Sequence, residues 1–359
     1  AITPEIAKKY ISLGFNLTLP NNYGTHLGFS DEDYKNFGVN FLDNEDDIIK
    51  NSEIVIQLGL PEEKKLSLFK ENQTLIGSLN SFLNKEKLEN LKSKKINCFS
   101  LELLPRITRA QSMDILSSQA NLAGYKAVVE AFKVYEKAIP MMMTAAGTIP
   151  AAKVLVVGAG VAGLQAIATA KRLGSQVEAF DVRPEVKEQV ESLGAKFIEV
   201  DSNSDDGVGS GGYASETSEE YKAKQQELMK ERVGKSDIVI TTALIPNRPA
   251  PMLIPKSMVE TMAPGSVIMD LASENGGNCE LTQENEIVNH NGVLIDGNSN
   301  LPSTMAYHSS QLFSKNIEAI IDHCHSEEGF KLDKEDEIID GMLFIENGEV
   351  RHQPTKESM

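Results

Sequence analysis

Short apolar runs alternate with amphipathic stretches along the first third of the chain. The apolar runs end at glycine, proline or polar residues and predict strands at residues 16–20, 39–42, 53–58, 75–78 and 96–99. The stretches between them predict helices at residues 3–14, 31–37, 43–50 and 85–94. Because strands that alternate with helices favour a parallel sheet, this region is predicted to be an α/β domain.

The same alternation returns in the second half of the chain. Apolar runs there predict strands at residues 153–157, 177–180, 196–200, 237–241, 266–271 and 293–296, and the intervening stretches predict helices at residues 161–173, 184–193 and 219–232. A helix at residues 307–323 is expected to carry the chain back to the first domain. Residues 338–350 are predicted to form a hairpin about Asn347 and Gly348, since Asn-Gly favours tight hairpin turns.

The segment Lys153–Asp181 carries the strongest chemical signal. A buried strand runs into Gly158, Gly160 and Gly163, spaced G-x-G-x-x-G at the start of a helix. The first glycine allows a tight turn, the second lets the backbone approach a pyrophosphate, and the third lets helix and strand pack closely. Strand, glycines, helix, second strand and acid together predict dinucleotide binding; the alternative is a glycine-rich turn that binds nothing.

Asp181 ends the second strand of this unit and bears on cofactor choice. An acid at this place accepts hydrogen bonds from the adenosine ribose hydroxyls and repels a 2′-phosphate, which favours NAD(H) over NADP(H). Arg183, two residues further on, is able to pair with such a phosphate and leaves the alternative open.

Three loops are predicted at the carboxyl ends of the later strands, where open parallel sheets bind ligands. They place Ala243, Leu244 and Asn300 near the nucleotide. A glycine-rich stretch at residues 201–217 is expected to be mobile. It is either a simple insertion or a lid in which Tyr213 closes on the ligand.

The most distinctive segment is Pro105–Val128. It begins as a loop crowded with Arg106, Arg109, Gln111 and Asp114, and then becomes a helix. A solvated loop with Asp114 near a helix start explains the same residues without function. Three methionines, Met141 to Met143, follow the helix and are predicted more often to be core than a binding surface.

Composition narrows the possible functions. The chain has 359 residues, enough for two domains, and a net charge of −17, which argues against nucleic acid and against direct docking on anionic lipid. Its three cysteines are far apart and indicate no disulfide framework or metal site. No apolar run is long enough to span a membrane. Thr3 and Pro4 start a helix at once, so a native strand is expected to precede Ala1.

These segments together closely resemble the NAD(H)-binding subunit or domain of proton-translocating nicotinamide nucleotide transhydrogenases, over almost the entire chain. The stretch R-I-T-R-A-Q-S-M-D-I-L-S-S-Q is specific for that family, with Thr108 in place of its usual serine. A chain that ends at Met359 without a membrane segment resembles the split bacterial form, with a separate first α subunit. The wider superfamily includes alanine dehydrogenase. The family's first strand is missing, so the first sheet is expected to be incomplete.

The resemblance implies an α/β fold of two Rossmann-like domains with parallel sheets. The first comprises residues 1–117 and 305–359, and the second, residues 118–304, is a dinucleotide-binding domain inserted in it. It implies an oxidoreductase subunit that is active only with its partners. Hydride would pass from NADH to NADP+ on a partner, and membrane subunits would couple the transfer to proton translocation.

The implied partners are an NADP(H)-binding β subunit, a membrane α subunit and a second copy of the chain. The implied location is cytoplasmic and peripheral on the inner membrane. The residues carried over are Arg106, Gln111, Asp114 and Ser117 at the dihydronicotinamide ring, Val161 and Gly163 at the pyrophosphate, Asp181, Val182 and Arg183 at the ribose, Gly212 and Tyr213 at the tip of the mobile loop, and Gln225 and Leu244 nearby.

Two other hypotheses belong to different classes. An alanine dehydrogenase-like enzyme would reduce a 2-oxo acid, but the family's lysine and histidine are replaced by the region of Gln57 and Gly59 and by residues 78–81, leaving no proton donor. A non-catalytic nucleotide-binding module is the third, because the isolated subunit is also inactive in forward transfer.

Overall fold

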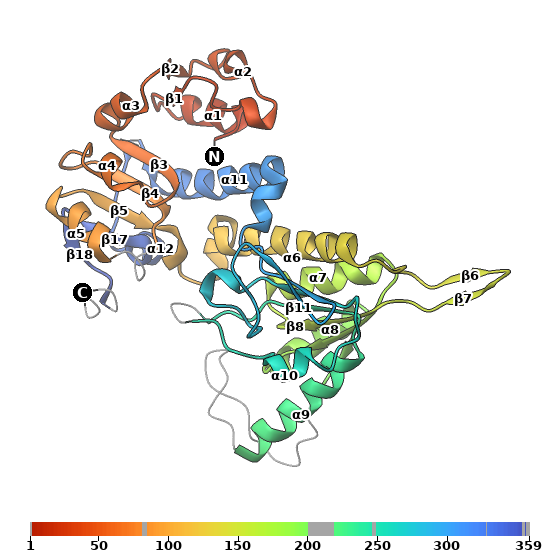
Figure 1. The fold of residues 1–359 in the computed structure, drawn as a ribbon. Coiled ribbons are helices and arrows are strands. Elements are labelled where there is room, and N and C mark those ends of the chain that lie inside the picture. The colour runs from red at the N-terminus through yellow and green to blue at the C-terminus, as the bar shows by residue number, and fades with distance from the viewer. Residues whose placement is uncertain are drawn as a thin grey trace. The chain divides into compact units, whose positions relative to one another are not determined.

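The computed structural model describes residues 2–80, 85–199, 219–245, 249–327, 329–353 and 356. The chain divides into two compact units, the first made of Ala1–Gln119 with Ala306–Met359 and the second of Ala120–Met305 (Figure 1). The predicted mobile loop, with Gly212 and Tyr213, lies outside the described residues.

The first unit contains a five-stranded sheet in the order β18-β17-β5-β4-β3. β3 (Ile54–Gly59), β4 (Thr74–Ser78) and β5 (Asn97–Ser100) are parallel, as predicted. β17 (Leu343–Glu346) and β18 (Glu349–Val350) form the predicted hairpin, and β17 runs antiparallel to β5. A separate parallel pair joins β1 (Thr18–Pro20) to β2 (Asn40–Leu42).

The hairpin prediction was too long at its start. Residues 338–342 belong to a helix, α12 (Glu337–Met342), because Asp336 caps it by accepting hydrogen bonds from the backbone N–H groups of Ile338 and Ile339. The chain therefore turns from a capped helix into β17 without an intervening loop.

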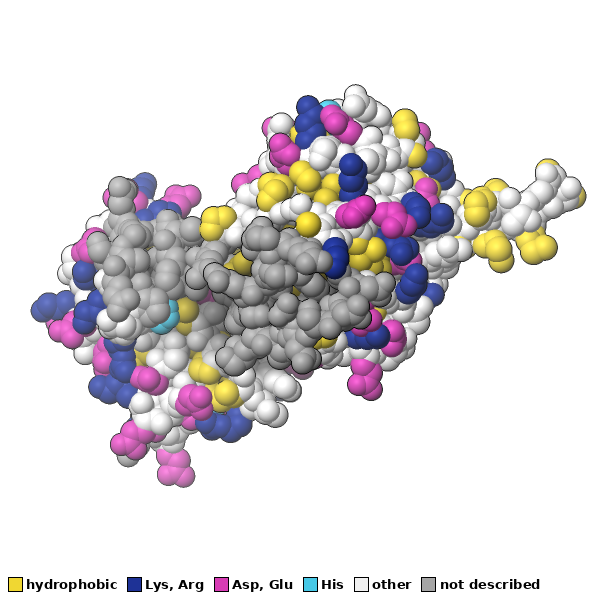
Figure 2. All heavy atoms as spheres, turned by 90° about the horizontal axis from the view of Figure 1, so that it is seen from below, with side chains coloured by type: hydrophobic (Ala, Val, Ile, Leu, Met, Phe, Trp, Pro, Cys, Tyr) yellow, Lys and Arg dark blue, Asp and Glu magenta, His cyan; other side chains and the backbone are white. Residues whose placement is uncertain are grey.

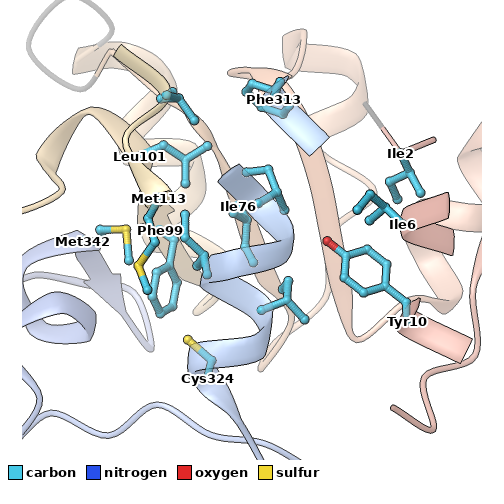
Figure 3. Packing of buried hydrophobic residues seen from close by; sticks show 14 of the residues in the cluster. Ile2, Ile6, Tyr10, Ile76, Phe99, Leu101, Met113, Phe313, Cys324 and Met342 are labelled. Atoms are coloured by element: carbon cyan, nitrogen blue, oxygen red, sulfur yellow. The ribbon is translucent and has the colours of Figure 1, made fainter. Parts of the chain in front are cut away.

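Helices cover the sheet of the first unit. They are α1 (Pro4–Ser12), α2 (Asp31–Lys35), α3 (Glu45–Asn51), α4 (Glu63–Leu66), α5 (Lys85–Ser93) and the long α11 (Ala306–Cys324), with 3₁₀ turns η1 (Thr25–Leu27), η2 (Leu101–Leu103) and η3 (Thr108–Met113). Figure 3 shows Met113 among Leu101, Phe99 and Met342. The distinctive segment is therefore anchored in this core, where each buried large side chain stabilises the fold by about 1.5–3 kcal/mol.

The second unit is built on a seven-stranded sheet in the order β10-β9-β8-β11-β12-β14-β13. The first six of these strands are parallel, which confirms the predicted fold class. Their chain order reverses between β8 and β11, as in doubly wound dinucleotide-binding sheets. The strands are β8 (Lys153–Val157), β9 (Gln176–Phe180), β10 (Lys196–Phe197), β11 (Ile238–Thr241), β12 (Val267–Asp270), β13 (Ile287–His290) and β14 (Val293–Asp296).

β13 was not predicted and pairs antiparallel with β14 at the edge of the sheet. The turn between them consists of Asn291 and Gly292, which have φ values of 53° and 84°. An Asn-Gly pair in this conformation is the strongest short hairpin signal, so the sequence contained the information.

Helices and 3₁₀ turns flank this sheet. They are α7 (Val161–Arg172), η4 (Pro184–Val186), α8 (Lys187–Ser192), α9 (Glu219–Lys235), α10 (Lys256–Val259), η5 (Ser273–Asn275) and η6 (Leu301–Met305), and α6 (Ile115–Val134) enters from the first unit. α6 and α7 pack closely, since a Cβ at Gly124 would lie 2.1 Å from the Ala162 carbonyl oxygen. Among the described residues, no helix combines the length and hydropathy needed to cross a membrane.

The three methionines are not core, which corrects the prediction. β6 (Met142–Thr144) and β7 (Gly147–Ile149) form a two-stranded hairpin in which every residue from 141 to 150 is exposed. Met143 is 80% exposed. Figure 2 shows the hydrophobic side chains along this projecting hairpin.

Candidate functional site

The glycine turn after β8 has the geometry that the fingerprint predicts. Gly158 has φ of 99°, a conformation that favours glycine, and its N–H donates to the Phe180 carbonyl at 2.8 Å. A Cβ at Gly163 would lie 1.8 Å from the Gly158 carbonyl oxygen. Two of the three glycines are therefore required by the backbone and by the packing of α7 against β8.

Gly160 is different, because neither constraint applies to it. Its φ of −77° suits any residue, and a Cβ built there meets no atom within 4 Å. It precedes α7 without any side-chain hydrogen bond that caps the helix. The first turn of α7 therefore faces open space with its N–H groups and the positive end of its dipole, which fits a pyrophosphate.

Asp181 lies directly after β9, and its side chain is 6% exposed. Its Oδ2 accepts from the Ala159 N–H at 2.7 Å, which ties the acid to the glycine turn. Its Oδ1 accepts from the Arg183 N–H at 2.9 Å. The Arg183 guanidinium completes the set with Nε on Oδ1 and Nη2 on Oδ2, both at 3.0 Å.

The pKa of Asp181 reflects two opposing effects. Burial raises it, while the hydrogen bonds from Arg183 and from the Ala159 N–H lower it by more, so the pKa lies below its ordinary value. Asp181 is therefore ionised at neutral pH and able to accept hydrogen bonds from hydroxyl groups.

The loop after β11 meets the glycine turn where the strand order reverses. Thr242 Oγ1 donates to the Gly158 carbonyl at 3.0 Å. Ala243 is held on both sides by the buried Asn278, whose Oδ1 accepts from the Ala243 N–H at 3.0 Å and whose Nδ2 donates to the Ala243 carbonyl at 2.9 Å. The predicted contact residue Ala243 is thus fixed by residues that the sequence reasoning did not single out.

Asp270, at the end of β12, organises the next loop. It is fully buried and accepts from the hydroxyls of Thr241 and Thr282 at 2.9 and 2.6 Å. It also accepts from the backbone N–H groups of Ala272, Asn278 and Cys279, at 3.0, 2.8 and 3.1 Å. A charged residue that ends a buried strand and is followed by Gly-Gly-Asn was the sequence signal for this role.

The remaining predicted residues of the second unit are less constrained. Val161, Val182 and Leu244 are 41%, 46% and 51% exposed, an unusual position for apolar side chains unless a ligand covers them. Gln225 is half-buried on α9, and the exposed Asn300 donates its N–H to Asn298 Oδ1.

In the first unit, the distinctive segment forms η3, whose side chains repeat every three residues. Ala110 and Met113 are buried and Ile107 is packed against the same core, so one face of the turn is apolar. Gln111 lies off this face and is exposed, as is Arg106 just before the turn. The side chains of Arg106 and Gln111 make no hydrogen bond or ion pair with any other described residue.

Asp114 and Ser117 start α6 together. Asp114 Oδ1 accepts from the Ser117 N–H at 2.9 Å and Oδ2 accepts from its hydroxyl at 2.5 Å. This arrangement caps a helix N-terminus, so the structure does bring these two predicted residues together.

Asn316 of α11 supports the segment from behind and was not foreseen. It is 7% exposed, its Nδ2 donates to the Ser112 carbonyl at 2.8 Å, and its Oδ1 accepts from the Ser118 hydroxyl at 2.7 Å. The only signal in the sequence is an asparagine within the apolar face that Phe313, Ile317 and Ile320 form at helical spacing.

Arg109 turns toward another partner. Its Nη1 lies 3.5 Å from Asp336 Oδ2, and Asp336 Oδ1 lies 3.0 Å from His323 Nε2. The hydrogen bond from His323 lowers the pKa of Asp336 to about 2, with help from the N–H groups that it caps. Arg109 therefore connects the segment to α11 and α12.

A glycine turn at the strand-order reversal of a doubly wound sheet, with an ionised acid after the second strand, defines a protein with a dinucleotide-binding unit of the Rossmann type. The chain belongs to the alanine dehydrogenase/PNT family. The C-terminal domain of that family matches residues 127–353 and the N-terminal domain matches residues 1–123.

Similar proteins agree with this membership. The chain is 45% identical over 360 aligned positions to the first of the chains that make up the NAD(P) transhydrogenase alpha subunit of Rhodospirillum rubrum, covering 98% of this chain and 94% of that one. The crystal structure of transhydrogenase from Sinorhizobium meliloti has a TM-score of 0.87 at 41% identity, covering 98% of this chain and 95% of that one. An L-alanine dehydrogenase structure has a TM-score of 0.82 at 22% identity, covering 99% and 94%, and shares the fold.

Proposed function

We propose that this chain is the NAD(H)-binding subunit of a proton-translocating transhydrogenase and passes hydride from NADH to NADP+ bound on a partner subunit. One observation carries the binding half of the proposal: Gly160 faces open space although neither its φ nor its packing requires glycine. The transhydrogenase relatives support the other half, since they share 41–45% of its residues over nearly the whole chain.

The residues of the second unit bind and orient the nucleotide in this proposal. The first turn of α7, with Val161 and Gly163, receives the pyrophosphate, and Asp181 accepts from the adenosine ribose hydroxyls. Val182 and Arg183 flank the ribose, and Ala243, Leu244, Gln225 and Asn300 complete the set. Gly212 and Tyr213 are proposed as the tip of a loop that closes over the ligand.

The residues of the first unit act at the nicotinamide end. NADH, when bound, supplies the hydride, and its transfer to a second nicotinamide moves no proton at the reacting carbon. Arg106, Gln111, Asp114 and Ser117 therefore need only position groups, and no acid or base is required of them. The exposed, unpartnered side chains of Arg106 and Gln111 suit contact with a ligand or a partner subunit.

The proposed assembly contains an NADP(H)-binding β subunit and a membrane α subunit that couples transfer to proton translocation. It places this chain in the cytoplasm, peripheral on the inner membrane. We also propose a homodimer. The exposed hairpin β6–β7 supports a protein contact, because a two-stranded hairpin that carries Met141, Met142 and Met143 on its surface is marginally stable without a partner.

Single-turnover hydride transfer tests the proposal. The purified chain is loaded with NADH and mixed with the NADP-binding partner and NADP+; transfer is expected in the mixture and in neither protein alone. Binding without transfer in the mixture would instead support a non-catalytic nucleotide-binding module.

The alanine dehydrogenase alternative makes the opposite prediction. Gln57 lies in β3 and Ser78 ends β4, the regions where that chemistry needs a lysine and a histidine. Pyruvate and ammonia with NADH should therefore give no turnover, and measurable alanine formation would move the assignment to that enzyme.

Nucleotide preference tests the role of Asp181. NADH should bind much better than NADPH, and Asp181→Ala should weaken NADH by about 1–3 kcal/mol because hydrogen bonds to a charged group are lost. Fluorescence titration measures both. Equal affinity of the wild-type chain for the two nucleotides would contradict the role.

A further inference from the structure

All four acceptor positions of the Asp181 carboxylate are occupied by the chain itself. Oδ1 accepts from the backbone N–H and Nε of Arg183, and Oδ2 accepts from the Ala159 N–H and Nη2 of Arg183. A carboxylate has about four such positions, two on each oxygen. A ribose therefore cannot donate to Asp181 in this arrangement unless one of these donors leaves.

The two backbone donors are fixed by the fold. The Ala159 N–H belongs to the glycine turn, whose position is set by the Gly158 N–H bond to Phe180, and the Arg183 N–H lies only two residues beyond Asp181 in the chain. The guanidinium is the movable donor, because it is one-third exposed and sits at the end of a flexible side chain.

The geometry of the guanidinium fork also matches what it would give way to. Its Nε and Nη2 each donate to a different oxygen of Asp181, both at 3.0 Å. A ribose 2′,3′-diol likewise offers two adjacent donors. If the guanidinium leaves, one acceptor position opens on each oxygen, which is the number that the diol fills.

We propose that Arg183 holds Asp181 as an internal ligand and that the adenosine ribose diol binds by displacing its guanidinium. Arg183 then sets nucleotide affinity through competition, since every hydrogen bond from the diol replaces one from the fork. This inference rests on the proposed nucleotide site and adds an exchange step to it.

The test is a thermodynamic cycle between the side chain and the diol. The affinities of 5′-AMP and 2′,3′-dideoxy-AMP are measured by calorimetry for the wild-type chain and for Arg183→Met, which keeps the apolar stem but has no donors. The preference for AMP over the dideoxy nucleotide should rise by about twofold to fivefold in R183M, the range expected for a partly exposed ion pair. Lys187→Met is the matched control: it removes a nearby cation that pairs with Glu199 at 2.7 Å, and it should leave the preference unchanged.

An unchanged or smaller preference in R183M would overturn the competition, because it means that guanidinium and diol bind together. If the wild-type chain binds neither AMP nor NADH, the proposed nucleotide site fails and this inference fails with it. NMR of the wild-type protein gives a second reading. The Arg183 Nε–H resonance should shift on adding AMP and stay in place with saturating dideoxy-AMP; the same shift with both nucleotides would contradict the exchange.

Discussion

The two groups of candidate residues are built in opposite ways. In the second unit, the acids at the carboxyl ends of β9 and β12 are buried and hydrogen-bonded: Asp181 accepts four hydrogen bonds and Asp270 five. In the first unit, η3 is anchored by the buried Ala110 and Met113, while Gln111 stays exposed and without a side-chain partner in the described structure.

This difference indicates two kinds of task. A saturated, buried network fixes loops in one position, which suits a site that must hold a nucleotide in a defined place. An exposed polar side chain on a rigid apolar turn is costly to neither fold nor solubility and remains available to a ligand or a partner chain. The predictions that follow test each side of this contrast, in order of decreasing effect.

Removing Asp270 should produce the largest loss of stability. In Asp270→Ala, two hydroxyls and three backbone N–H groups lose their buried acceptor, and the free energy of unfolding should fall by about 3 kcal/mol or more. Denaturant unfolding monitored in the second unit measures this. The exposed Glu284 provides the control, since Glu284→Ala in the same region should change stability by no more than about 0.5 kcal/mol. A similar loss in both variants would remove the structural role of Asp270.

Shortening Gln111 should separate binding from transfer. Gln111→Asn should leave NADH affinity nearly unchanged and slow single-turnover transfer by roughly a hundredfold, because a misplacement of about 1 Å costs about that much. Gln176→Asn is the matched control, as Gln176 is exposed at the amino end of β9. Wild-type transfer by the Gln111→Asn protein would sink the proposed role.

Arg106→Ala and Asp114→Asn should instead weaken NADH binding and transfer together. Asp114 also caps α6 through Ser117, so its variant should lose some stability as well. Little change in either quantity for all three variants would favour a loop that is polar only for solubility.

Replacing Asn316 tests whether the exposed turn needs its buried support. Asn316→Ala leaves the Ser112 carbonyl and the Ser118 hydroxyl without this partner, which should cost about 1–3 kcal/mol. Transfer should fall while AMP affinity stays unchanged, since AMP lacks the nicotinamide. Asn90→Ala, at an exposed asparagine of α5, should change neither quantity. A loss of stability without any loss of transfer would show that the position of η3 does not depend on Asn316.

Much of the second unit was predictable because its signals are local. Periodicity located β8 and β9, and the glycine spacing identified the turn between β8 and α7. The antiparallel β13 was missed although Asn291-Gly292 signalled its turn. The exposed position of the methionines was missed because an apolar run gives no information on whether a neighbouring surface exists to cover it.

The supporting residues of the site were harder to predict for a physical reason. Asn278, Asn316 and Asp270 act through hydrogen bonds to residues far along the chain, and such pairings depend on the tertiary fold. The saturation of Asp181 by Arg183 was also invisible, although the two residues are only two positions apart. The sequence places both at the ribose but does not decide whether they pair with a ligand or with each other.

The smallest expected effect concerns the acid that holds Arg109. The pKa of Asp336 is lowered to about 2, first by the hydrogen bond from His323, whereas an unfolded chain has a value of about 3.9. As the pH falls, the unfolded chain takes up this proton first, so the stabilisation is complete above about pH 4 and is lost as the pH approaches 2. The pair with Arg109 is largely in solvent, so the contribution should be at most about 1 kcal/mol. Unfolding free energies of the wild-type chain and of Asp336→Asn should differ at pH 6 and converge below pH 3. A difference that stays constant over this range would show that the charge of Asp336 does not stabilise the fold, and that only its hydrogen bonds to α12 matter.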